Sequence, residues 1–219
     1  TLTVAPWLTL AGIPVAEATG QQAWLALGFA IFYFGVPLVD LLVGVDSTNP
    51  SEEDVPQLEQ QSYFHNMLLV NLALAAVIWF IGMHYVATHE MTAIGWVAMT
   101  LSMFGVGGAS INLGHELGHK TDWKRRKASV FALGLAGLPH FSIEHNRGHH
   151  KHVATPEDPA SSRLGETYFQ FMCREMPGTW KRGWALEKER LAKKGHGFWH
   201  TENEILQASA VTVVLWSII

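Results

Sequence analysis

Histidine is the residue type in this sequence whose number and spacing can support chemistry. The chain of 219 residues contains twelve histidines, and five of them show a regular spacing within two short clusters. The first cluster, NLGHELGHK (residues 112–120), has two histidines four residues apart. The second, EHNRGHHKH (residues 144–152), repeats that spacing and adds a histidine directly after it. Because residues four apart lie on one face of a helix, each cluster predicts a pair of adjacent imidazoles. The predicted metal ligands are His115, His119, His145, His149 and His150.

The arrangement of these five histidines predicts a site for two metal ions. His150 points about 100° away from His149 on a helix, so one ion would struggle to use both, whereas two adjacent ions could. The sole cysteine, Cys173, lies outside both clusters, which excludes a cysteine-based zinc or iron–sulfur site. Imidazole suits zinc, copper, iron and nickel. Two histidine-bound metals at a membrane favour iron and O2 chemistry, although the ligand type alone leaves zinc and copper open.

The first cluster also matches a protease motif. The run from His115 through Glu116 to His119 reads H-E-x-x-H, the signature of zinc proteases in which the glutamate is the general base. A catalytic zinc uses three protein ligands and an open position. The second cluster offers more histidines than such a site needs, which argues against a protease.

The stretches that must position these histidines are apolar and predict an all-α membrane protein. The sequence is 48% hydrophobic and only 16% charged. Residues 23–45, 67–88 and 91–114 are each long enough to span a bilayer, which needs roughly 20 apolar residues. Residues 128–143 are shorter and favour a re-entrant or membrane-surface helix, and residues 205–219 begin a further span. We therefore predict a polytopic bundle of transmembrane helices with a histidine-rich metal site on its cytoplasmic side.

Charge is distributed so unevenly that it predicts the orientation of the chain. Residues 1–119 contain no lysine or arginine, and all fifteen basic residues lie between Lys120 and Lys194. Basic loops stay on the cytoplasmic side of a membrane, so both clusters are expected to face the cytoplasm. Since the sequence starts without Met and stops within an apolar run, we expect a fragment that is incomplete at both ends. The predicted organisation is 1–143 for transmembrane helices and the first cluster, 144–204 for a cytoplasmic segment with the second cluster, and 205–219 for the start of another transmembrane helix.

The two clusters and the residues that follow them resemble the membrane-bound alkane 1-monooxygenases of bacteria, also called alkane hydroxylases. The resemblance covers NLGHELGHK (residues 112–120) and EHNRGHHKHVATPEDPASSRLGE (residues 144–166). Fatty-acid desaturases share the histidine-box principle, but they usually have H-x2-HH in the second box, where this sequence has H-x3-HH. By position, the five predicted ligands match the family's iron ligands, which implies two non-haem iron ions as cofactors. The family also has a third box, H-x2-HH, and another histidine, which do not occur within these 219 residues.

The resemblance implies an integral-membrane diiron monooxygenase that converts alkanes to 1-alkanols. Its substrates would be an alkane and O2, and its electrons would come from rubredoxin, which an NAD(P)H-dependent reductase reduces. It also implies a place in the bacterial inner (cytoplasmic) membrane, with the metal site facing the cytoplasm, and no nucleic-acid partner. The basic segment 120–127, with Lys181 and Arg182, can guide an acidic partner or contact anionic lipid, and both interpretations stay open.

Other side chains are expected to support such a site. Carboxylates often orient metal-bound imidazoles through the second ring nitrogen. Glu116, Glu144 and Asp158 are candidates for this role, although each can also cap a helix or pair with a base. An alkane dissolves in lipid, so we expect it to reach the metals through the membrane. The aromatic candidates for lining or blocking that route, which can equally face lipid or pack, are Phe32, Tyr33, Phe34 and Trp79.

Two alternative functions remain open. A related histidine-box fatty-acid desaturase, or a sterol or xylene hydroxylase, would use the same metals but give a different product. A membrane metal transporter would place its ligands along a path in mid-span, whereas both clusters lie at or beyond one predicted membrane interface. Product analysis separates the first group, and metal transport that persists without O2 or an electron donor would identify the second.

Overall fold

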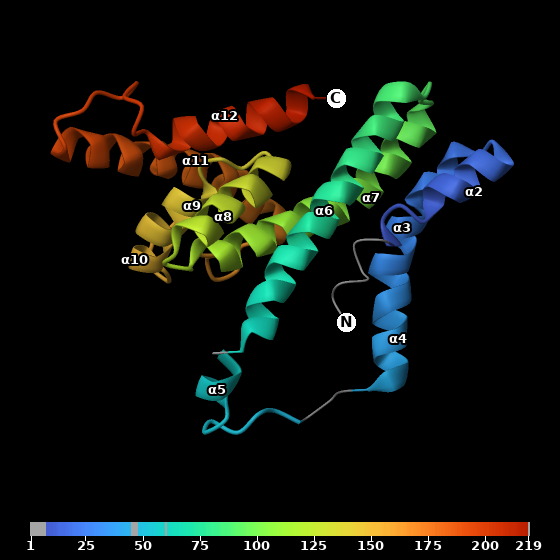
Figure 1. The fold of residues 1–219 in the computed structure, drawn as a ribbon, viewed down its shortest axis with the longest axis horizontal. Coiled ribbons are helices and arrows are strands. Elements are labelled where there is room, and N and C mark those ends of the chain that lie inside the picture. The colour runs from blue at the N-terminus through green and yellow to red at the C-terminus, as the bar shows by residue number, and fades with distance from the viewer. Residues whose placement is uncertain (1–7, 45–47, 60, 219) are drawn as a thin grey trace. The chain divides into compact units, whose positions relative to one another are not determined.

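The computed structural model describes residues 8–44, 48–59 and 61–218, apart from the side chains of residues 59, 64 and 65. These described residues form helices and turns with no β-strand among them, which confirms the predicted all-α class. The chain divides into two compact units, Thr1–Leu113 and Gly114–Ile218. Figure 1 traces it through both units, and each is described by itself below.

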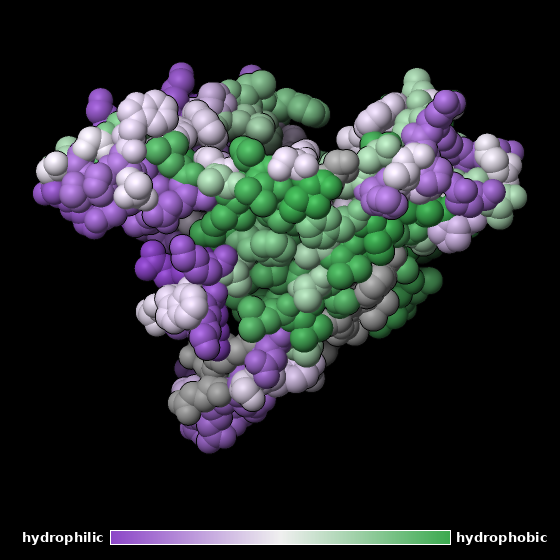
Figure 2. Space-filling view, turned by 45° about the horizontal axis from the view of Figure 1, so that its top comes forward, coloured by the Kyte–Doolittle hydropathy of each residue, from purple (hydrophilic) through white to green (hydrophobic). Residues whose placement is uncertain are grey.

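The first unit contains long apolar helical stretches. Gln22–Val43, Asn66–Thr88 and Ala93–Gly118 are long and apolar enough to cross a membrane, and they correspond to the three predicted spans. Many of their apolar side chains are exposed, and Figure 2 shows a broad area of hydrophobic side chains on the face that it draws. Lipid would cover such side chains, so the chain is that of a membrane protein. Within the part of this unit that the structure describes, the assigned helices are α2 (Gly12–Thr19), η1 (Gln22–Ala26), α3 (Leu27–Ala30), η2 (Ile31–Gly35), α4 (Val36–Val43), α5 (Val55–Glu59), α6 (Ser62–Thr88) and most of α7 (Ala93–Gly118).

The first apolar stretch is not one regular α-helix. It begins with the 3-10 helix η1, continues through α3 and the π-helix η2, and ends as α4. Pro37 lies at the start of α4. A proline ring has no N–H and clashes with the carbonyl four residues before it. The wider π-turn directly ahead of Pro37 accommodates the ring without ending the helix.

Close contacts hold the helices of the first unit together. The hairpin of α6 and α7 is visible in Figure 1, and a Cβ at Gly82 would lie only 2.5 Å from Sδ of Met103. Ser102 on α7 donates through its hydroxyl to the Leu25 carbonyl at 2.7 Å and accepts from the Phe29 N–H at 3.2 Å. These bonds link α7 to the first apolar stretch, so the helix that ends in the first histidine pair is firmly packed.

The second unit consists of the end of α7 and a set of shorter helices. The apolar residues 128–143 do not form the single helix that was predicted. A helix begins earlier, where the Asp122 side chain accepts from the Arg125 N–H at 3.0 Å, and it ends at Leu135. Gly137, with φ of 73°, then turns the chain into a new helical turn. The helices of this unit are α8 (Trp123–Leu135), α9 (Phe141–Glu144), η3 (His145–His149), α10 (His150–His152), α11 (Tyr168–Lys193) and α12 (Glu204–Ser217).

The two longest helices of the second unit have well-defined starts. A capping box begins α11, because the Thr167 hydroxyl accepts from the Gln170 N–H at 3.4 Å and the Gln170 side chain accepts from the Thr167 N–H at 2.9 Å. Trp216 on α12 donates its indole N–H to the Gly134 carbonyl at 3.1 Å, which fixes α12 against α8. The 14 residues of α12 are apolar but shorter than a span, so the predicted further transmembrane helix stays a prediction.

Candidate metal centre

Four of the five predicted ligands lie in one cluster. His115, His119, His145 and His150 each offer a ring nitrogen, and these four atoms lie within 4.8 Å of one another. At the end of α7, the Nε2 atoms of His115 and His119 are 3.1 Å apart. In the second sequence cluster, the Nε2 atoms of His145 and His150 are 3.0 Å apart. The rings of His115 and His145 have centroids 4.5 Å apart, so the fold unites the two sequence clusters.

The second pair of this cluster depends on a π-turn. Residues His145–His149 form the π-helix η3, in which the His150 N–H bonds to the His145 carbonyl. A π-turn contains one residue more than an α-turn. Residues five apart therefore face the same point, which brings His145 and His150 together. The four-residue spacing predicted His145 beside His149, and these two rings also lie together, stacked with centroids 5.3 Å apart.

His149 lies outside the group of four and has a carboxylate partner. Its Nδ1 is 2.7 Å from Oδ2 of the buried Asp158. A carboxylate accepts only, so the proton lies on Nδ1, and Nε2 of His149 is left with a lone pair for a metal. Asp158 also accepts from the Ser161 hydroxyl at 2.6 Å. Although burial acts to raise the pKa of Asp158, the hydrogen bonds from Ser161 and His149 hold it below its ordinary value.

Arg182 on α11 joins two buried carboxylates of this site. Its guanidinium donates to Oδ1 of Asp158 at 2.8 Å, and through both Nε (2.8 Å) and a terminal nitrogen to Oε1 of Glu144. Burial raises the pKa of Glu144, and the adjacent guanidinium opposes that rise. A Cβ at Gly148 would lie 2.7 Å from Nε of Arg182, so the glycine gives the guanidinium room.

This placement corrects one interpretation of the sequence and refines another. Arg182 is engaged inside the protein, so it is not available to guide an acidic partner. Glu116 has Oε1 3.1 Å from Nδ1 of His115, and Asp158 contacts His149. Glu144, the third predicted carboxylate, reaches the site through Arg182 instead. No local spacing pointed to Arg182, because its partners lie 24 and 38 residues away in the sequence.

The electrostatic setting keeps at least two of the imidazoles neutral. Burial, followed by the neighbouring rings of His115 and His150, lowers the pKa of His145 to about 4. Burial also lowers the pKa of His119, again with help from the adjacent imidazoles. Neutral rings are the form that binds metal ions, so His145 and His119 are ready to bind at pH 7.

The donor set fits transition-metal ions. Two ligands of one ion, each about 2.1 Å from it, are ~3.0–3.4 Å apart in octahedral or tetrahedral geometry. The Nε2 separations of 3.1 Å and 3.0 Å in the two histidine pairs match this requirement. Two neutral imidazoles that face each other through nitrogen share a single proton, whereas a metal ion would use both lone pairs. Ligand type and spacing therefore both suit a histidine-bound metal centre.

The predicted channel residues lie in the first unit. Phe32, Tyr33 and Phe34 are in η2 and are exposed, whereas Trp79 on α6 is buried, with 3% of its surface accessible. The rings of Phe32 and Tyr33 meet edge to face, with centroids 5.5 Å apart. Their part in a substrate route stays a prediction.

Comparisons with known proteins agree with this site. The sequence model of the fatty acid desaturase family matches residues 90–219, which include both histidine clusters. The chain is 39% identical over 212 residues to alkane 1-monooxygenase 1 of Alcanivorax borkumensis, an alignment that covers 97% of the chain and 52% of that relative. It is 39% identical over 214 residues to the alkane 1-monooxygenase of Pseudomonas putida, with 98% and 53% covered. For the alkane 1-monooxygenase of Ectopseudomonas oleovorans, the identity is 38% over 217 residues, with 99% and 54% covered.

Apolar helices and a cluster of imidazoles define a membrane protein with a histidine-rich metal site. The chain belongs to the fatty acid desaturase family, whose model covers more than half of its residues. Its similarity to alkane 1-monooxygenases over nearly the whole chain confirms the resemblance expected from the histidine boxes. The chain spans about half the length of these curated relatives.

Proposed function

We propose that the full-length protein is an alkane 1-monooxygenase. The reaction takes an alkane, O2, two electrons and two protons, and it gives a 1-alkanol and water. The observation that carries this proposal is the group of four imidazoles whose nitrogens lie within 4.8 Å of one another. Its support is the 38–39% identity to curated alkane 1-monooxygenases over nearly the whole chain.

The chemistry requires a metal cofactor, for which we propose two iron ions. The terminal C–H bond of an alkane is strong and has no polar handle, so acid–base groups alone cannot activate it. Histidine-bound iron would supply the oxidising chemistry with O2, while the protein holds and orients the reactants. The proposed ligands in this half of the protein are His115, His119, His145, His149 and His150. We expect the remaining ligands from the third box of the family, elsewhere in the full-length chain.

The side chains around the proposed ligands have separate tasks. Asp158 keeps the proton of His149 on Nδ1 and so directs Nε2 of that ring to the metal. Glu116 performs the same task for His115. Arg182 pairs with both Asp158 and Glu144 and holds Asp158 in position. Such fixed partners would keep the ligand nitrogens in place whether or not a substrate is bound.

Substrate, electrons and membrane side complete the proposal. An alkane would enter from the lipid, with Phe32, Tyr33, Phe34 and Trp79 as the residues to test for a channel. Electrons would come from rubredoxin and its NAD(P)H-dependent reductase. The site would face the cytoplasm from the inner membrane, because all basic residues of the chain follow position 119.

The test is product analysis with iron quantitation on the full-length protein. With rubredoxin, its reductase, NADH and a medium-length alkane, we expect 1-alkanol to form at a rate that rises with the iron content. His145→Ala and His150→Ala should each lose iron and lower alcohol formation at least 100-fold. His152→Ala, two residues beyond His150 and outside the group of four, is the matched control and should keep both. Normal alcohol formation by the His145 or His150 variant would refute the assignment.

A fatty-acid desaturase is the second candidate, because the family model that matches carries that description. It would use the same metals to remove two hydrogens from an acyl chain instead of inserting oxygen. The same assay with a fatty acyl substrate separates the two functions. A double bond without any alcohol would favour the desaturase, and a 1-alkanol from an alkane would favour the monooxygenase.

A further inference from the structure

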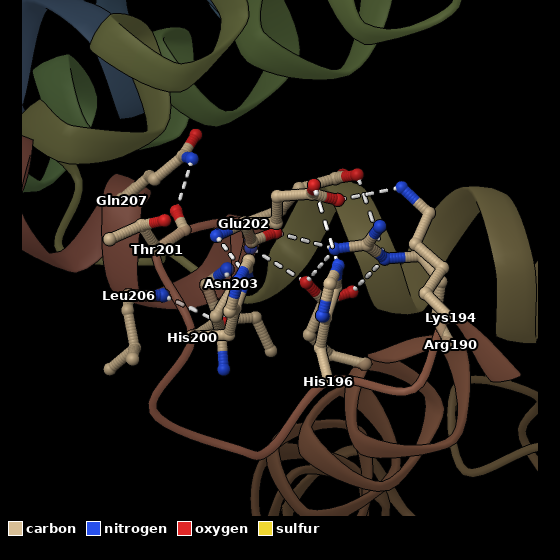
Figure 3. Close-up of polar contacts among 12 residues, drawn as sticks. Arg190, Lys194, His196, His200, Thr201, Glu202, Asn203, Leu206 and Gln207 are labelled. Atoms are coloured by element: carbon tan, nitrogen blue, oxygen red, sulfur yellow. Dashed lines mark hydrogen bonds and ion pairs between the residues drawn. The ribbon is translucent and has the colours of Figure 1, made fainter. Parts of the chain in front are cut away.

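A second group of possible ligands lies in the loop between α11 and α12. The rings of His196 and His200 stack face to face, with centroids 3.7 Å apart and 4° between their planes. Nε2 of His196 is 3.6 Å from Oε1 of Glu202. The three residues each offer a ligand atom within 4.8 Å of the other two. Figure 3 shows the two imidazole rings side by side, with Glu202 next to His196.

The backbone that carries these residues is fixed on both sides. Asn203 is fully buried, caps α12 through its side-chain oxygen and donates to the Phe198 carbonyl at 2.9 Å. Gln207 donates to the Thr201 carbonyl at 2.7 Å, and Arg190 donates to the Glu202 carbonyl at 2.6 Å. A loop that is ordered in advance loses little conformational entropy when it binds a ligand. The side chains, by contrast, are partly or fully exposed. A ring nitrogen binds metal in the plane of its ring, so the two stacked rings must turn apart before both can bind one ion.

Two imidazoles and one carboxylate form a donor set for a divalent transition metal. Zinc takes histidine nitrogen and carboxylate oxygen at about 2.0–2.2 Å, and three protein ligands leave a position for water. Ligands of one tetrahedral ion are ~3.4 Å apart, close to the 3.6 Å between His196 and Glu202. His200 now accepts at Nδ1 from the Glu202 N–H at 3.2 Å. A metal bound at Nδ1 of His200 would replace this hydrogen bond from Glu202. A metal bound at Nε2 would require the proton of the ring to move from Nε2 to Nδ1.

Lys194 determines how strongly such a site can bind. Its ammonium group is 2.7 Å from Oε2 of Glu202, while Oε1 points to His196. The ion pair holds the carboxylate in its charged form, and Lys194 is the leading cause that lowers the pKa of Glu202. It also places a positive charge next to the proposed cation, so removing that charge should strengthen metal binding.

We propose that His196, His200 and Glu202 form a surface site for one divalent transition-metal ion, with Zn²⁺ as the best match. The site is separate from the candidate iron centre in its residues and does not rest on the proposed function. Bound metal would join three points of the loop at which the chain passes from the polar α11 into the apolar α12.

Zinc uptake by the iron-loaded full-length protein tests this proposal. Equilibrium dialysis against micromolar Zn²⁺, followed by metal analysis, should show one zinc per chain beyond any bound by the native iron centre, with the iron content unchanged. The double variant His196→Ala/His200→Ala should lose this zinc and keep its iron. Glu202→Gln should weaken zinc binding at least tenfold, a loss that would correspond to one ligand.

Two further variants separate a specific site from general attraction of cations. Glu189→Gln removes another exposed carboxylate that pairs with a lysine, here Lys193 at 2.7 Å, and it should not change zinc affinity. Lys194→Gln should raise zinc affinity severalfold. Equal zinc uptake by the native protein and the double histidine variant would overturn the proposal, as would zinc that enters only as iron leaves. Retained iron and an unchanged circular dichroism spectrum show that each variant is folded.

Discussion

At the scale of single residues, Asp158 is a carboxylate in a demanding position. It is 1% exposed, yet it carries a negative charge shared among His149, Ser161 and Arg182. A buried charge is tolerated only when its partners compensate for the lost hydration. The distance of 2.7 Å to Nδ1 of His149 is the observation behind our proposal that this carboxylate orients the ring.

Asp158→Asn tests that task with almost no change of shape. The amide cannot attract the Nδ1 proton as a carboxylate does, so His149 becomes a weaker and less oriented ligand. Loss of such a partner typically costs 10- to 100-fold in metal affinity or activity, and we expect alkane hydroxylation to fall within that range. The measurement is iron content together with the 1-alkanol formation rate in the full-length protein.

The neighbouring Glu157 provides the control for this variant. Its side chain is exposed and lies next to Asp158 in the sequence, so Glu157→Gln removes one negative charge from the same loop. We expect normal iron content and rate. If Asp158→Asn were as active as Glu157→Gln, the carboxylate would not orient a metal ligand. The assignment of His149 as an iron ligand would then lose its main structural support.

At the scale of elements, the loop of residues 153–167 is held against α11 by two arginines of that helix, Arg174 and Arg182. Arg174 donates to both carboxylate oxygens of Glu166, at 2.9 and 2.7 Å, and to the carbonyls of Pro159 and Ser161, both at 2.9 Å. The hydrogen bonds from Arg174 lead the causes that lower the pKa of Glu166 to about 2. These hydrogen bonds of Arg174 fix the loop segment that contains Asp158.

The depressed pKa predicts how stability responds to acid. An unfolded glutamate has a pKa of about 4.3. Because the folded value is lower, the ion pair stabilises the protein fully above about pH 5, and this contribution is lost as the pH falls towards about 2. Glu166→Gln should therefore lower the thermal unfolding midpoint at pH 7, and the difference from the native protein should shrink steadily between pH 5 and pH 3. A difference that does not change with pH would show that packing, rather than charge, explains the loss.

The elements also show where sequence reasoning succeeds and where it stops. Three apolar stretches and the pair His115–His119 follow from hydrophobic length and helical spacing, and the structure contains both as predicted. The π-turn that pairs His145 with His150 has no such signature. The sequence pattern of these residues is also compatible with an α-helix, and only the packed structure shows which of the two forms. Arg182 comes from another helix, α11, and only the tertiary structure shows that it contacts Glu144.

The split of residues 128–143 into two helices has a similar explanation. Gly137 adopts φ of 73° just after the first helix ends, a conformation that glycine reaches without the steric cost of a Cβ. The sequence shows the glycine, but its neighbours decide whether a glycine ends a helix or lies within it. Gly148, which makes room for Arg182, lies inside a continuous helical segment.

At the scale of the whole molecule, charge and hydropathy follow the order of the chain. The candidate membrane spans end at Gly118, and every lysine and arginine lies between Lys120 and Lys194. Both proposed metal sites use residues at or after the end of the third span. The proposed function requires such an order, because the basic part of the chain would face the cytoplasm and the apolar helices would lie in the lipid from which an alkane would enter.

Cys173 makes this orientation directly testable. It is the one cysteine among the 219 residues, it is exposed, and it lies on the polar helix α11. In full-length protein in which cysteines elsewhere are replaced by serine, a membrane-impermeant maleimide should label Cys173 in inverted membrane vesicles and leave it unlabelled in intact spheroplasts. The reason is the positive charge that surrounds it in sequence, which resists transfer across the membrane.

The opposite side of the membrane can be probed in the same protein. Glu90→Cys, combined with Cys173→Ser, places the label in the exposed turn between α6 and α7, where no basic residue occurs. This cysteine should react in spheroplasts and be protected in inverted vesicles. A reversed pattern for both positions would put the histidine cluster on the outer face, out of reach of cytoplasmic electron donors, and the rubredoxin-dependent function would then be untenable. Labelling of both cysteines from the same side would instead contradict the assignment of α7 as a membrane span.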